Sequence, residues 1–274
     1  MELIQGITKL DMTDYVLYYI DSISEEFKKE IRSRLVAICH GADNAQYASG
    51  IYSYKETVKE FLKRYNEDDP TGRRNKGLVG ELLIHTIIDY EGKFIAASPF
   101  FNMEERSFKK GFDIALFEPN DSELWIAEIK SGQIQKKQKN SSSAIVGLIN
   151  SAKTDLKERL NDKDIHLWLN AINAAKVAMV NNTSERNAVL RLLKQCADKE
   201  VAGHSKSTDY NVILSASLFH PIEDKMGEKE IGKKYASIKK ENLFNRILII
   251  ALQKSTYKAV YDFLKSEVES TDEK

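Results

Sequence analysis

The segment Gly111–Gly132, with the sequence GFDIALFEPNDSELWIAEIKSG, decides the fold. It contains two apolar runs of strand length, separated by the residues Pro-Asn-Asp at 119–121. These residue types favour tight turns, because proline fixes one backbone torsion and asparagine and aspartate bond to the nearby backbone. Two apolar runs joined by such a turn predict a β-hairpin.

Three charged residues, Asp113, Glu128 and Lys130, lie in or at the end of the two apolar runs, although buried strands seldom carry charge. Side chains alternate along a strand, so Glu128 and Lys130 point to the same face of the second strand. An antiparallel partner strand can set Asp113 beside them. Two carboxylates and an ammonium group at one end of a hairpin are suited to a divalent metal ion and a water nucleophile. The hairpin is therefore the candidate active site.

The length and composition indicate an ordinary globular protein. The 274 residues can bury a substantial core, and the sequence is 42% hydrophobic and 30% charged. No stretch reaches the roughly 18 consecutive apolar residues of a membrane span, and the first residues lack the basic and apolar parts of a signal peptide. The expectation is a soluble protein of the cytoplasm.

Basic and acidic residues are equal in number, at 41 each, so total charge neither favours nor excludes a nucleic-acid substrate. Basic residues nevertheless cluster before, within and after the candidate site, at 73–76, 106–110 and 136–139. Such clusters are most often solvated loop charges, and contact with phosphate groups is the alternative. The residues considered for nucleic-acid binding are Arg73, Arg74, Lys109, Lys110, Gln133, Lys136, Lys137 and Gln138.

The order of elements suggests two parts. Residues 1–69 are expected to form a helical N-terminal region that could include a short strand near 15–20, and residues 70–274 form the main domain with a helical insertion around 165–202. The patterns predict helices over 24–40, 51–65, 76–90, 142–160, 165–179, 184–198 and 256–268, and strands over 94–101, 210–219 and 244–252. Residues 221–241 are expected to be loop or a poorly packed helix.

A helix containing Glu81 precedes the hairpin that carries Asp113, Glu128 and Lys130, and helices and strands follow it. This order resembles the PD-(D/E)xK nuclease superfamily, whose restriction-endonuclease-like core is a mixed α/β sheet flanked by helices. Taken alone, a glutamate on an apolar helix would be assigned to the helix flank. The resemblance instead implies that Glu81, Asp113 and Glu128 hold Mg²⁺, with Mn²⁺ as a substitute. It also implies that Lys130 orients or deprotonates the attacking water.

Three segments carry a narrower resemblance. RRNKGLVGELLIHTII at 73–88, KKGFDIALFE at 109–118 and LWIAEIKSG at 124–132, followed by a polar loop and a helix, are similar to the HamA family, the nuclease subunits of the Hachiman antiphage defence system. The family implies a cytoplasmic effector that degrades DNA with little sequence preference. It also implies a partner helicase, HamB, which restrains the nuclease.

Two other functions stay open on the sequence alone. A nuclease fold that has lost catalysis could bind nucleic acid or a protein partner, and a ribonuclease could use the same four residues. His85 lies four residues after Glu81 and is interpreted as a core or rim histidine, because no second histidine stands at ligand spacing. The sequence contains no Walker A motif, so any use of ATP belongs to a partner.

Overall fold

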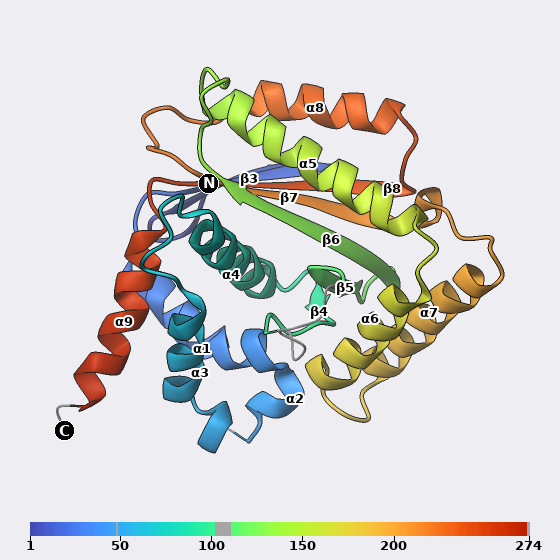
Figure 1. The fold of residues 1–274 in the computed structure, drawn as a ribbon, viewed down its shortest axis with the longest axis horizontal. Coiled ribbons are helices and arrows are strands. Elements are labelled where there is room, and N and C mark those ends of the chain that lie inside the picture. Colours follow the sequence, from blue (N-terminus) through green and yellow to red (C-terminus); the bar gives the residue numbers. More distant parts are fainter. Residues whose placement is uncertain (48, 102–110, 273–274) are drawn as a thin grey trace.

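The computed structural model describes residues 1–47, 49–101 and 111–272, and an eight-stranded mixed sheet lies at its centre (Figure 1). The strand order is β1-β2-β3-β8-β7-β6-β5-β4. Strands β3, β8, β7 and β6 are parallel, and antiparallel strands extend the sheet at both ends. The bounds are β1 Glu2–Ile4, β2 Ile7–Met12, β3 Tyr15–Ile20, β4 Ile95–Ala96, β5 Ile114–Glu118, β6 Glu123–Gly132, β7 Asn211–Phe219 and β8 Arg246–Lys254.

Helices cover both faces of the sheet, and each face buries its own apolar core (Figure 1). One face packs against α1 (Glu25–His40), α3 (Tyr54–Arg64), α4 (Arg73–Glu91) and α9 (Lys258–Asp272). The other packs against α5 (Ser141–Asn161), α6 (Ile165–Ala178), α7 (Ser184–Val201) and α8 (Glu228–Lys240). The short helix α2 (Ala42–Ala45) and single turns at Gly50–Tyr52 and Ser207–Asp209 complete the elements. The expected mixed α/β sheet flanked by helices is confirmed.

The expected helical N-terminal region is wrong for β1 and β2, whereas the short strand considered near 15–20 is present as β3. β3 is parallel to β8 and lies inside the sheet, so strands from both sides of the expected boundary near residue 70 share one sheet. The β3 sequence YVLYYI is apolar throughout because this strand is covered on both faces, and such a run shows no strand-like alternation. Helices α1 and α3 agree with the expectation for the rest of this region.

Two further segments differ from expectation. Within 94–101 only Ile95–Ala96 pairs as a strand, and the N–H groups of Phe100 and Phe101 instead donate to Ile38 and Cys39 carbonyls at the end of α1. The segment 221–241 contains the regular helix α8, whose Ile231 and Ile238 are fully buried in the core on the α5 face of the sheet. The predicted helices in the insertion around 165–202 are confirmed as α6 and α7. Among the described residues, no helix is both long and apolar enough to cross a bilayer.

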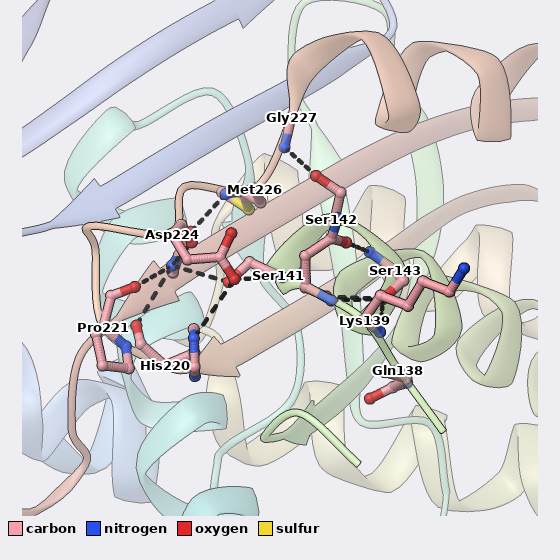
Figure 2. Close-up of polar contacts among 12 residues, drawn as sticks. Gln138, Lys139, Ser141, Ser142, Ser143, His220, Pro221, Asp224, Met226 and Gly227 are labelled. Carbon is pink, nitrogen blue, oxygen red and sulfur yellow. Dashed lines mark hydrogen bonds and ion pairs between the residues drawn. The ribbon is translucent and has the colours of Figure 1, made fainter. Parts of the chain in front are cut away.

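Figure 2 shows how the N-terminus of α5 is tied to the loop that follows β7. Ser141 N–H donates to Asp224 Oδ2 at 2.8 Å, and Gly227 N–H donates to Ser142 Oγ at 2.7 Å. The buried amide of Gln253, on β8, donates to the Asp224 carbonyl oxygen at 2.9 Å. Buried polar groups that are fully bonded hold their elements in one arrangement. The start of α5 is thus fixed relative to the central strands.

Candidate active site

The predicted hairpin is formed by β5 and β6, and β5 is the shorter of the two strands. Ile114, the first residue of β5, lies opposite Ala127, so β6 continues from Glu128 to Gly132 beyond the end of its partner. Asp113 stands immediately before β5, and its Oδ2 accepts a hydrogen bond from Ile129 N–H at 2.7 Å. A carboxylate therefore occupies the place where the next strand residue would pair with β6.

Glu128 and Lys130 point to the same face of β6, as expected from the strand period. Lys130 Nζ lies 2.7 Å from Glu128 Oε1. The Glu128 side chain is only 1% exposed, whereas that of Lys130 is 28% exposed. The hairpin thus brings Asp113, Glu128 and Lys130 together, and this part of the sequence prediction is confirmed as geometry.

Helix α5 adds two charged side chains to this cluster. Asp155 Oδ2 lies 2.7 Å from Lys130 Nζ. The Arg159 guanidinium contacts both oxygens of Glu128, with Nη1 at 3.0 Å from Oε2 and Nη2 at 3.2 Å from Oε1. Arg159 Nη1 also donates to the Gly111 carbonyl at 3.1 Å. Both Glu128 oxygens therefore face cations.

The sequence reasoning missed Asp155 and Arg159. Their spacing of four residues places them on one face of a helix, next to the buried positions Ala152 and Leu156. That spacing indicates a charged helix face. It does not predict which strand this face packs against, because that depends on how α5 packs over β6.

Burial and neighbouring charges alter the acidities in this cluster. Burial, with the negative charge of Asp113, raises the pKa of Glu128 to about 7, although Arg159 and Lys130 act in the opposite direction. Burial alone would lower the pKa of Lys130, but Glu128, Asp155 and Asp113 stabilise the ammonium and raise its pKa overall. The cluster therefore holds a protonated lysine beside a carboxylate that a cation would help to ionise.

Glu81 reaches the site from α4, on the opposite face of the sheet. Gly80 allows the close approach, because a Cβ there would overlap Ser131 Oγ and lie 3.0 Å from Ser217 Cβ. Ser217 Oγ also donates to the Gly80 carbonyl at 3.3 Å. Glycine is the residue that lets a helix backbone pack this tightly against a sheet. The Gly-Glu pair thus places the glutamate where the helix lies nearest to β6.

Glu81 and Asp113 line one cavity of about 530 Å³. The aromatic and amide side chains that also line it are Phe100, Phe101, Phe112, Asn170 and Asn173. Glu128 and Lys130 are not among its described lining residues, since they point toward α5. Within the described chain, Glu81, Asp113 and Glu128 do not form a group whose oxygen atoms all lie within 4.8 Å of one another. The structure gathers the four predicted residues around the start of β5 but does not bring the three carboxylates to one point.

The donor set is nevertheless suited to a divalent metal ion. Asp113 and Glu128 supply hard carboxylate oxygens, which are the ligands that Mg²⁺ and Mn²⁺ prefer. Glu128 Oε2 is buried and receives no hydrogen bond of good geometry among the described residues, and its ion-pair partner is Arg159. Asp113 and Glu128 are thus the side chains that could hold a metal ion, with Glu81 as a third carboxylate at the cavity wall.

Another acidic group lies at the turn of the hairpin, away from Asp113. Among the described residues, its side-chain oxygen atoms do lie within 4.8 Å of one another, and its members are Glu118, Asp121 and Glu123. Arg246 contacts Asp121 and Glu123, and Lys93 Nζ lies 3.3 Å from Glu118. Cations of the chain already neutralise this group, so it is not a metal candidate.

The weaker candidates fall into three groups. Gln133 Oε1 accepts a hydrogen bond from the buried Lys76 Nζ at 2.8 Å, and Gln138 Oε1 accepts one from Gln135 N–H at 2.7 Å, so both amides have structural partners. The side chains of Arg73, Arg74, Lys136 and Lys137 are exposed. Lys109 and Lys110 lie outside the described residues.

His85 belongs to the core, as expected. It is a buried residue of α4, and burial lowers its pKa to about 3. Its ring meets Phe100 edge-on, with ring centres 5.6 Å apart. A neutral imidazole in apolar surroundings is consistent with packing.

Comparison with known proteins finds a family match over nearly the whole chain. A family model described as HamA matches residues 6–268 of the 274. No curated protein and no solved structure matches the sequence. The matched range includes Glu81, Asp113, Glu128 and Lys130, and every strand from β2 to β8. Because the match covers nearly the full length, the chain belongs to the HamA family.

Proposed function

We propose that this protein is a metal-dependent nuclease that hydrolyses DNA phosphodiester bonds with little sequence preference. Its membership of the HamA family supports a role as a component of Hachiman antiphage defence. The observation that carries the catalytic proposal is the arrangement of Asp113, Glu128 and Lys130 at the edge of β6 that β5 leaves unpaired. Carboxylates clustered at a strand edge are suited to holding a metal ion that binds a phosphodiester.

Each residue has a chemical role in this proposal. Asp113 and Glu128 hold Mg²⁺, and Glu81 approaches from the cavity wall. When bound there, the ion lowers the pKa of a water ligand and polarises the scissile phosphate. Lys130, with its ammonium 2.7 Å from Glu128, orients the attacking water and offsets charge that develops on the phosphate oxygens.

Control by a partner is the second part of the proposal. Nonspecific affinity for DNA depends on the number of phosphates that a protein neutralises. This chain carries 41 basic and 41 acidic residues, which favours weak binding of DNA by the isolated subunit. We therefore propose that the partner helicase HamB, implied by the family, brings the nuclease to DNA and restrains it in the cytoplasm until it is needed.

The test is a plasmid digestion with the purified full-length chain, alone and with HamB, in Mg²⁺ or Mn²⁺. Glu128→Gln and Lys130→Met are expected to lower the cleavage rate by about 100-fold or more, since a positioned acid–base group contributes that much. Lys153→Met is the control, because Lys153 lies on α5 like Asp155, and its 2.7 Å ion pair is with Glu241, which follows α8. Full activity in both site variants would show the assignment to be wrong. An RNA substrate digested in parallel separates deoxyribonuclease from ribonuclease activity.

One observation favours a second candidate function. Arg159 and Lys130 together neutralise Glu128, as they would in a nuclease fold that has lost catalysis and binds nucleic acid or a protein. Such a subunit binds DNA equally well with and without divalent metal, and Asp113→Ala leaves that binding unchanged. The main proposal predicts that DNA cleavage requires both.

A further inference from the structure

The Glu128 carboxylate is held by two cations from different elements. Lys130 follows it on β6, and Arg159 reaches it from α5 with a nitrogen near each oxygen, at 3.0 and 3.2 Å. A guanidinium that faces both oxygens of a carboxylate binds it more specifically than an ammonium does. Arg159 faces both oxygens of a side chain that is only 1% exposed, whereas Lys130 contacts one of them.

Lys130 and Arg159 place two positive charges beside Glu128, at 2.7 and 3.0 Å. While both remain there, they repel an entering divalent cation. If the guanidinium leaves, only the charge of Lys130 remains of these two.

Arg159 also contacts the segment that carries Asp113. Its Nη1 lies 3.1 Å from the carbonyl of Gly111, two residues before Asp113. The guanidinium therefore lies between Glu128 and the segment that carries Asp113. The Arg159 side chain is 28% exposed, so it has a path toward solvent. The N-terminus of α5 is fixed by Ser141 and Ser142 (Figure 2), so the required movement falls on the side chain.

We propose that Arg159 occupies the cation position at Glu128 until a divalent ion enters, and that the ion displaces the guanidinium from the carboxylate. The inference rests on the metal-dependent function proposed above. Arg159 is then a positioning residue. It orients Glu128, and it sets the metal concentration at which the site fills.

The test measures the rise in melting temperature that Mn²⁺ produces in the full-length chain at pH 8. Arg159→Met keeps the length of the side chain and removes its charge, so the variant has a lower melting temperature without metal and a larger rise with Mn²⁺. About tenfold tighter binding makes that rise larger by roughly 3–5 °C. Arg159→Lys keeps the charge but loses the two-nitrogen contact, and it is expected to give an intermediate rise.

Two controls define the outcomes. Lys153→Met, on the same helix, should show the rise of the wild-type chain, and Glu128→Gln should show none. If Arg159→Met gives no cooperative unfolding transition, Arg159→Lys alone carries the comparison with the wild-type chain.

A rise in the Arg159 variants that equals or falls below that of the wild-type chain overturns the displacement. If Glu128→Gln still abolishes the rise in that case, the metal site stands without displacement. If the wild-type chain and all variants ignore Mn²⁺, the metal site and the displacement both fail.

Discussion

Ile129 N–H donates a hydrogen bond to Asp113 Oδ2 at 2.7 Å, so a side chain completes the strand edge that β5 leaves unpaired. The same carboxylate lies beside Glu128, and its charge contributes to the raised pKa of that residue. Asp113 therefore has a structural contact and an electrostatic one at the same point of the fold.

Two substitutions of Asp113 distinguish its hydrogen bond to Ile129 from the effect of its charge. Asp113→Ala leaves Ile129 N–H without its acceptor and should lower the free energy of unfolding by about 1–3 kcal/mol. Asp113→Asn retains an oxygen for that hydrogen bond and should cost less than about 1 kcal/mol, yet it loses the charge and with it the proposed nuclease activity. Urea unfolding measures the first effect and plasmid digestion the second. Equal stabilities of the two variants would contradict the hydrogen-bond role.

The stability of the protein should depend on pH through Glu128. Its pKa is near 4.5 in an unfolded chain and about 7 in the folded protein, because burial disfavours the carboxylate. Between these values the folded state binds more protons than the unfolded state, so the stabilisation contributed by the protonated group falls as pH rises from 4.5 to 7. Urea unfolding at several pH values in a chelating buffer measures this trend.

The control for this pH dependence is Glu128→Gln, which cannot titrate. The wild-type chain should lose stability relative to the variant as pH rises from 4.5 to 7. Above pH 7 the difference in unfolding free energy between the two should stay constant. A difference that stays constant with pH would show that Glu128 has an ordinary pKa.

The close packing of α4 predicts opposite effects for two glycines on one helix. Gly80→Ala adds a methyl group that meets Ser131 and Ser217, and it should cost about 1–3 kcal/mol as an overpacked contact. Gly77→Ala meets nothing within 4 Å and should stabilise the protein by about 0.4–1 kcal/mol through reduced freedom of the unfolded chain. Thermal unfolding of both variants gives the comparison.

A second substitution identifies the cause of the Gly80 effect. Ser131→Gly in the Gly80→Ala background removes the overlapping hydroxymethyl group and should recover part of the lost stability. If the double variant is no more stable than would be expected from adding the two single effects, the contact between α4 and β6 does not explain the cost.

The sequence predicted the hairpin well because its information is local. A turn at 119–121 and the two-residue period of β6 were enough to place Asp113, Glu128 and Lys130 together. The sequence also predicted the helix that contains Gly80 and Glu81, which is α4. These signals depend on neighbours in sequence, which a single chain displays directly.

The rest depended on contacts between distant segments. The sequence leaves a strand near 15–20 open, because an unbroken apolar run is typical of a buried strand and of a buried helix alike; the pairing of β3 with β8 shows that it is a strand. Asp155 and Arg159 reach the site because α5 packs over β6. Arg159 lies 31 residues after Glu128 in the sequence and contacts it at 3.0 Å. Spacing within a helix does not specify the surface that the helix covers.

The loop after β6 offers a last prediction, because it contains exposed lysines and one amide with a structural partner. Lys136 and Lys137 are exposed, whereas Gln133 Oε1 accepts a hydrogen bond at 2.8 Å from Lys76, whose Nζ also donates to the Thr71 carbonyl at 2.8 Å. If both lysines contact phosphates, Lys136→Ala with Lys137→Ala should reduce the slope of log affinity against log salt by about 2. Gln133→Ala should leave that slope unchanged and lower stability by about 1 kcal/mol, because Lys76 loses an acceptor. Fluorescence anisotropy of labelled DNA at several salt concentrations measures the slope, and a smaller slope for Gln133→Ala alone would instead place the amide at the DNA backbone.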